Sequence, residues 1–318
     1  MPEPLTHRPD VLVLAAGGTL GEAWMRGLLD GAGRATGIDF RDCEYFVGTS
    51  AGSIVAAFLA AGREPDSGPE ARAAKEWGSK AGEANGAPQG IPLGAAGNDP
   101  SGAEGADRGP LASAVGRIGM TAAAPFAPLA LAGTAPGGAV ARAAALAAVP
   151  RGKRSLGGLA RLVEQSGASF DGRLRIAAVD RRNGKRVVFG APGSPETSVA
   201  QAELASCSIP WVFKPVTIDG REYVDGGVWS PTNLDATPAR RGIEVLCLNP
   251  TAASRPLSSV SNAAALAESL ALRARGARVR TLRPDNGAAE AMGHNLMDRS
   301  RVPEALAAGY AQGLALAA

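Results

Sequence analysis

A serine between small residues is the most chemically suggestive feature of the chain. Residues 48–52 read Gly-Thr-Ser-Ala-Gly, so Ser50 stands at the centre of a G-x-S-x-G pattern. An apolar stretch at residues 45–47 predicts a strand before it, and residues 53–61 predict a buried helix after it. A serine on such a strand-to-helix turn can act as a nucleophile, and the small neighbours let strand and helix cross closely. The same residues also fit a serine that only caps the helix.

A glycine-rich loop follows the first predicted strand. Gly17 and Gly18 are consecutive, and Ala16 precedes them. Adjacent glycines allow the backbone to present two successive N–H groups to one anion, which suits an oxyanion hole, a phosphate or a dinucleotide pyrophosphate. A plain tight turn is the remaining interpretation. No Gly-Lys-Ser/Thr follows, which excludes a Walker A loop, and Ala16 at the first position makes the dinucleotide fingerprint incomplete.

A carboxylate stands at the end of a further predicted strand. Residues 223–228 read Tyr-Val-Asp-Gly-Gly-Val, so Asp225 directly precedes two glycines. Upstream, residues 205–210 read Ala-Ser-Cys-Ser-Ile-Pro, and residues 218–220 read Ile-Asp-Gly. These segments complete a set of three glycine- or serine-rich elements that follow strands.

Histidine is scarce, which restricts the chemistry. The chain holds only His7 and His294, so a multi-histidine metal site is excluded. The order Ser50, Asp225, His294 is also that of the α/β-hydrolase triad, and a triad therefore stays an alternative. His294 carries no distinct motif, and His7 lies in a polar tail.

Composition indicates a globular protein with a substantial core. The chain has 318 residues, of which 45% are hydrophobic, and a net charge of +3 without the clustered basic face that nucleic acid binding requires. Cys43, Cys207 and Cys247 are widely spaced in apolar runs, which predicts buried, reduced thiols. Residues 1–10 lack a signal-peptide pattern, so we expect a cytoplasmic protein, either free or peripheral to a membrane.

Strands and helices alternate along the chain, which predicts a three-layer α/β domain. Hairpin turns are indicated at residues 183–184 and 219–220. The predicted strands are residues 11–15, 45–47, 174–179, 186–189, 243–248 and 279–282, and the predicted helices are residues 22–35, 53–61, 156–165, 198–206, 261–275 and 302–316.

In this order, the glycine loop, the G-T-S-A-G turn, the A-S-x-S-I-P segment and the D-G-G strand end resemble the patatin-like phospholipases. The resemblance covers residues 11–61 and about 155–317. It implies a three-layer α/β/α fold with a mainly parallel central sheet and a Ser–Asp dyad, in which Ser50 is the nucleophile and Asp225 the general base. The oxyanion hole is implied at the backbone N–H groups of Gly17, Gly18 and Thr19. The other motif residues are Gly21, Gly48, Thr49, Ala51, Gly52, Gly226 and Gly227.

The resemblance implies a lipid acyl hydrolase of the phospholipase A, lysophospholipase or esterase kind, which cleaves carboxylic esters through an acyl-enzyme. It implies a lipid substrate at a membrane or micelle surface, and we expect no cofactor, metal or nucleic acid partner. Two residues depart from the family pattern: Ala16 stands where a third glycine is usual, and Leu20 where a basic residue is usual. A Ser-Asp-His esterase that uses His294, and a non-catalytic lipid- or nucleotide-binding domain, remain as alternatives.

We expect one domain over residues 1–318, interrupted by an insert at about 63–150. Glycine and proline make up a third of residues 63–110, which predicts an irregular segment. Residues 111–149 are apolar and Ala-rich, with no charge across residues 118–141. That stretch is long enough for a membrane span but is broken by prolines and glycines. A lid, a segment lying on a bilayer and ordinary packed helices are the other interpretations.

Overall fold

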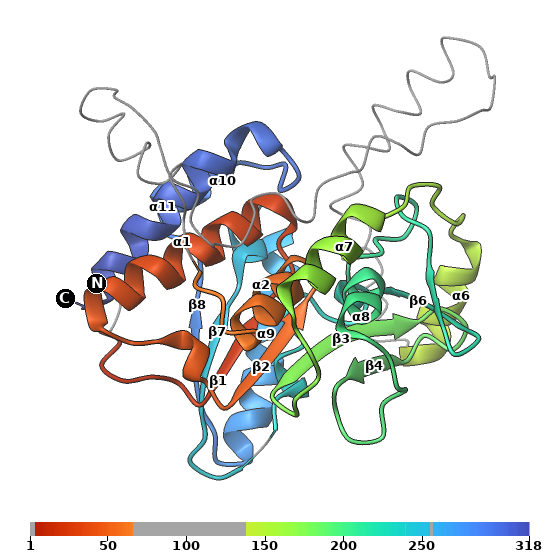
Figure 1. Ribbon diagram of the computed structural model, residues 1–318, viewed down its shortest axis with the longest axis horizontal. Helices are drawn as coiled ribbons and strands as arrows, with labels where there is room; N and C mark the ends of the chain where they lie inside the picture. The colour runs from red at the N-terminus through yellow and green to blue at the C-terminus, as the bar shows by residue number, and fades with distance from the viewer. Residues whose placement is uncertain (1–3, 66–137, 239, 255–256, 318) are drawn as a thin grey trace.

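A mixed sheet of eight strands forms the centre of the structure (Figure 1). The computed structural model describes residues 4–65, 138–238, 240–254 and 257–317. The strand order is β5-β6-β3-β2-β1-β7-β8, with β4 paired to β3. The strands are β1 (Val11–Leu14), β2 (Tyr45–Thr49), β3 (Leu174–Asp180), β4 (Arg186–Phe189), β5 (Val216–Ile218), β6 (Arg221–Asp225), β7 (Glu244–Leu248) and β8 (Arg278–Leu282).

The run from β3 through β2, β1 and β7 to β8 is parallel, while β4, β5 and β6 pair antiparallel. The predicted α/β fold with a mainly parallel sheet is therefore confirmed. The hairpin predicted at Asn183 and Gly184 is also present, between β3 and β4.

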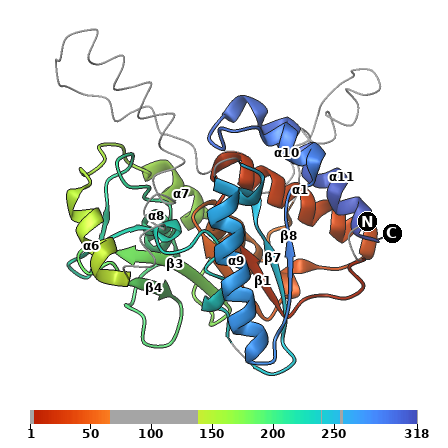
Figure 2. The same ribbon diagram turned by 180° about the vertical axis from the view of Figure 1, so that it is seen from behind.

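Helices cover both faces of the sheet, as Figures 1 and 2 show from opposite sides. One face packs against α1 (Gly18–Thr36), α2 (Ala51–Ala60), α7 (Gly157–Ser166), α8 (Val199–Ser206), α10 (Asn286–Met292) and α11 (Val302–Leu314). The other face packs against α9 (Leu257–Ala274) and α6 (Gly138–Ala148). Each face of the sheet has its own hydrophobic core, and β1 contributes to both. Leu12 and Leu14 lie in the core on the first face, and Val11 and Val13 lie in the core on the second. A strand buried on both faces has to be apolar throughout.

Helix α1 begins in the glycine loop, four residues before the predicted start at residue 22. It packs closely along α11 through glycines on both helices. A side chain at Gly27 or Gly31 would collide with the backbone of α11, and one at Gly309 or Gly313 would collide with that of α1. The contact fixes α1, and therefore the loop at its N-terminus, against the last helix of the fold.

Strand β3 brings two other strands together along one of its edges. Strand β2 pairs with the first four residues of β3 and β6 with the last three, while β4 overlaps both of these stretches. Since β4 occupies one edge, β2 and β6 must follow each other along the opposite edge. The adjacent residues Ala177 and Ala178 consequently have Thr49 and Asp225 as their respective partners.

The predicted insert falls largely outside the described residues, and so do most of residues 118–141. Its described end forms α6, where Leu146 packs against Val179, Val224 and Val228 of the central part of the fold. Among the helices of the described ranges, none combines the length and the apolar character that a bilayer span requires.

Gly52 tests how closely β1 and α2 cross. A methyl group at Gly52 would collide with the backbone carbonyl of Leu14, whereas one at Gly158 in α7 meets open space. We expect Gly52→Ala to lower the free energy of unfolding by about 1–3 kcal/mol, the usual effect of overpacking. Gly158→Ala should be neutral or stabilising by up to about 1 kcal/mol. Urea unfolding of both variants measures the difference, and equal effects would contradict the close crossing.

Candidate active site

Ser50 occupies a strained turn between β2 and α2. Its φ of 51° and ψ of −127° lie in a region that side-chain-bearing residues rarely adopt. Its amide donates to Ser206 Oγ at 2.9 Å, and its carbonyl accepts from Ser53 N–H at 2.8 Å and Ser53 Oγ at 2.6 Å. The side chain is not tied into the helix as a cap. The geometry therefore does not fit a helix-capping serine, and a strained strand-to-helix turn of this kind can present a serine hydroxyl for chemistry.

The other motif residues of this turn have steric or hydrogen-bonding roles. Gly48 leaves room for the backbone of Ser53, where a side chain would collide, and Ala51 opens α2. The Thr49 hydroxyl accepts a hydrogen bond from Asn233 Nδ2 at 3.1 Å, which ties the end of β2 to the segment after β6.

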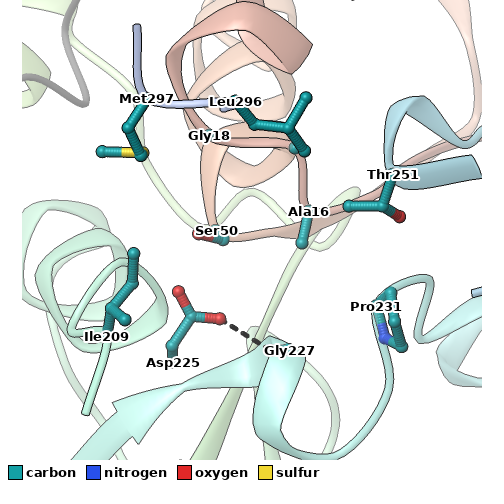
Figure 3. Close-up of a pocket in the computed structure, with 11 residues that line it drawn as sticks. Ala16, Gly18, Ser50, Ile209, Asp225, Gly227, Pro231, Thr251, Leu296 and Met297 are labelled. Carbon is teal, nitrogen blue, oxygen red and sulfur yellow. Dashed lines mark hydrogen bonds between the residues drawn. The ribbon is translucent and has the colours of Figure 1, made fainter. Parts of the chain in front are cut away.

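Asp225 lies at the end of β6 and is 1% exposed. Its Oδ1 accepts a hydrogen bond from the Gly227 amide at 2.7 Å, at the start of the short 3-10 helix η5 (Gly226–Val228). Its Oδ2 is buried without a hydrogen-bond partner of normal geometry among the described residues. Figure 3 shows the carboxylate facing Ser50. Gly226 is required next to it, because a side chain there would collide with the Ala177 carbonyl.

The environment of Asp225 changes its acidity. Burial raises its pKa to about 7, while interactions with the Ser50 side chain and the Gly227 amide lower it. A carboxylate with a pKa near 7 can both accept and return a proton at neutral pH, which is what a general base requires.

The glycine loop presents free amides beside Ser50. The N–H groups on either side are bonded: Ala16 donates to Pro231 O at 2.8 Å and Leu20 to Leu296 O at 3.0 Å. Within the part of the chain that the structure describes, the amides of Gly17, Gly18 and Thr19 have no acceptor. They stand at the N-terminus of α1, the positive end of its dipole, and the first turn of this helix carries no acidic residue.

Gly17 and Gly18 line the pocket, whereas Thr19 is not among its lining residues and is buried. Gly18 has a φ of 59°, which favours glycine, and a side chain there would press on Leu296 and Met297. Gly21 packs against Pro250. The geometry therefore places two of the three predicted loop residues at the pocket wall.

One pocket contains Ser50, Asp225, Gly17 and Gly18 (Figure 3). Its other lining residues are Ala16, Ile209, Gly227, Pro231, Thr251, Leu296 and Met297. Ile209 belongs to the A-S-x-S-I-P segment, Ala16 to the glycine loop and Gly227 to the D-G-G end. No sequence motif predicted the remaining four residues. Leu296 and Met297 come from the connection between α10 and α11, far along the chain from the motifs.

Neither histidine lines this pocket. His294 is exposed and is not among the pocket-lining residues, and His7 is exposed and pairs with Glu244. In the described ranges, no cluster of three or more His, Cys, Asp or Glu side chains is arranged to hold a metal ion. The cysteines Cys43, Cys207 and Cys247 are buried and unpaired, as predicted.

The family model described as patatin-like phospholipase matches residues 12–238. This chain belongs to the patatin-like phospholipase family, and its membership supports a lipid hydrolase.

Two solved structures match this chain with low sequence identity and TM-scores below 0.5. VipD from Legionella pneumophila is 16% identical with a TM-score of 0.42, and the match covers 98% of this chain and 67% of VipD. The type III effector protein ExoU is 14% identical with a TM-score of 0.38, and the match covers 99% of this chain but 53% of ExoU. Comparison with curated proteins found no match.

Asp225 should lower stability at neutral pH. In the folded chain Asp225 keeps its proton up to about pH 7. In the unfolded chain an aspartate has the ordinary pKa of 3.8 and has lost its proton well below that pH. The free energy of unfolding therefore falls as pH rises from about 4 to 7 and stays reduced above that range. We expect the difference in unfolding free energy between Asp225→Asn and wild type to shift in favour of the variant between pH 4 and pH 8. The shift should be at most about 4 kcal/mol.

Thermal unfolding at pH 4 and pH 8 measures this effect, with Asp219→Asn as the matched control. Asp219 is an exposed turn residue with a φ of 47°, a conformation that asparagine also tolerates. A stability difference between wild type and Asp225→Asn that does not change with pH would contradict the raised pKa.

Proposed function

We propose that this protein hydrolyses carboxylic esters of lipids, with Ser50 as nucleophile and Asp225 as general base. The observation that carries the proposal is the shared pocket, in which both side chains lie beside the free amides of Gly17 and Gly18. Family membership supports the lipid part of the proposal. The apolar pocket residues Ile209, Leu296 and Met297 support it too, because they suit an acyl chain better than a polar group.

In the first half-reaction, Ser50 Oγ bonds to the ester carbonyl carbon while its proton passes to Asp225 Oδ2. The carbonyl oxygen becomes an oxyanion, which the Gly17 and Gly18 amides stabilise as hydrogen-bond donors. The tetrahedral intermediate collapses as the bond to the alcohol oxygen breaks, and the leaving alcohol takes the proton from Asp225. Ser50 then carries the acyl group.

In the second half-reaction, a water molecule gives a proton to Asp225 and bonds to the acyl carbon. Collapse of this second intermediate breaks the bond to Ser50 Oγ, which recovers the proton from Asp225 and releases the carboxylic acid. Thr19 is proposed as a third amide donor at the same helix terminus. The Leu20 side chain is uncharged and fully buried, so we propose that the amides and the helix dipole stabilise the oxyanion without a cation at this position.

We further propose that the substrate is taken from a membrane or micelle surface, where lipid esters reside. The buried, unpaired cysteines support a reducing compartment such as the cytoplasm. A single domain interrupted by an insert is also proposed, because strands from both sides of residues 66–137 form one sheet and contribute to one pocket.

Single substitutions separate the dyad from a histidine triad. We expect Ser50→Ala and Asp225→Asn each to reduce kcat by at least about 1,000-fold, the scale of losing a nucleophile or its base. His294→Ala should stay within about twofold of wild type, because His294 is exposed and outside the pocket. Initial rates on p-nitrophenyl butyrate measure this. A loss in His294→Ala that matches the loss in Asp225→Asn would favour the triad.

The pH dependence gives a further check on the base. Since Asp225 must be ionised to accept the serine proton, kcat/KM should rise with pH through an acid limb centred at about 7. An acid limb near the ordinary aspartate pKa of 3.8 would contradict a base whose pKa is raised by burial.

A further inference from the structure

Two side chains of helix α8 contribute hydrogen bonds to the turn at Ser50. Ser206 and Glu203 lie one turn apart on this helix. The Ser206 hydroxyl accepts from the Ser50 amide at 2.9 Å and donates to the Ala177 carbonyl at 2.7 Å, which joins the turn to β3. Glu203 contacts the Ser53 hydroxyl, which is hydrogen-bonded to the Ser50 carbonyl. The amide and the carbonyl of the strained Ser50 are therefore both hydrogen-bonded to other residues.

The number of hydrogens available at the Ser53 hydroxyl determines whether Glu203 must be protonated. Ser53 Oγ lies 2.6 Å from the Ser50 carbonyl oxygen and 2.6 Å from Glu203 Oε2. A hydroxyl has one hydrogen, and a carbonyl oxygen can only accept. An ionised carboxylate can also only accept, so both short contacts are hydrogen bonds only if Glu203 supplies a hydrogen of its own.

The surroundings of Glu203 agree with a protonated acid. Its side chain is fully buried, and its Oε1 has no hydrogen-bond partner in the described ranges. Burial raises its pKa to about 8; the hydrogen bond with Ser53 opposes this shift, and the nearby carboxylate of Glu22 on α1 adds to it. The same buried region includes Cys207 at the end of α8 and Asp225 of β6. These three groups carry no positive charge, and the buried Arg26 on α1, one turn from Glu22, is not among the groups that shift the pKa of Glu203.

We propose that Glu203 is a positioning residue that keeps a proton and, through Ser53, holds the Ser50 carbonyl in the strained turn. The proposal rests on the proposed function of Ser50 and adds a residue outside the sequence motifs. When Glu203 loses its proton, the Ser53 hydroxyl turns toward the charged carboxylate and the Ser50 carbonyl loses one of its two hydrogen bonds. Glu203 thereby sets the upper pH limit of activity.

Three variants test this role with p-nitrophenyl butyrate between pH 6 and pH 10. Glu203→Gln keeps a donor toward Ser53 but cannot ionise, and Glu203→Leu removes the donor at similar volume. Gln201→Ala, on the exposed side of the same helix, is the matched control. For each variant kcat and KM are measured separately, because a positioning residue acts mainly on kcat.

We expect wild-type kcat to fall above about pH 8 and the fall to disappear or to move up by at least about one pH unit in Glu203→Gln. Glu203→Leu should lose about 10- to 100-fold in kcat with KM within about twofold, the effect of a misplaced reacting group. Gln201→Ala should resemble wild type. An identical alkaline limb in wild type and Glu203→Gln would overturn the proposal, and so would an unchanged kcat in folded Glu203→Leu.

Thermal unfolding separates this proposal from the proposed function. The folded chain holds the Glu203 proton up to about pH 8, whereas the ordinary glutamate pKa is 4.5, so wild-type stability should fall relative to Glu203→Gln from pH 5 to pH 8. If wild type hydrolyses no ester, the proposed function fails and this stability profile still decides the protonation of Glu203. Parallel profiles for the two proteins would overturn it.

Discussion

The site depends on one edge of strand β3, on which two strands that run in opposite directions follow each other. Parallel β2 ends opposite Ala177 and antiparallel β6 ends opposite Ala178, so their last residues, Thr49 and Asp225, meet head to head. Ser50 is the next residue after β2. Pairing with β3 thus brings together two proposed catalytic groups that are far apart in the sequence. The small residues Ala177 on β3 and Gly226 after β6 allow the backbones to lie close together at this point.

Burial then gives this junction its electrostatic character. Asp225 and Glu203 are both enclosed, and desolvation raises the pKa of each toward neutrality. The free amides at the start of α1 supply the opposing positive potential without a cationic side chain. Two acids that prefer the neutral form lower the stability of the fold above their ordinary pKa values. The α1–α11 contact, in which glycines on both helices allow close backbone packing, holds the loop in place despite this cost.

The sequence was informative where the signal is local. The turn at Ser50, the hairpin at Asn183 and the strand end at Asp225 each need particular residues within a few positions, and each is present as predicted. The glycines at the start of α1 predict a loop, but the helix begins already at Gly18, where this stretch packs against Pro250 and Leu296. Long-range pairing along β3 has no local signature. The same holds for Leu296 and Met297, which reach the pocket from a connection with no motif, and for Glu203, which resembles any polar residue in a helix.

We propose that this junction makes Ser50 a nucleophile activated by Asp225. Peptide mapping by mass spectrometry after treatment with a fluorophosphonate probe tests it most directly, because the probe bonds covalently to activated serines. We expect one adduct, on Ser50, which forms much more slowly in Asp225→Asn. An adduct on a different serine, or full labelling that persists in Ser50→Ala, would show that Ser50 is not the nucleophile.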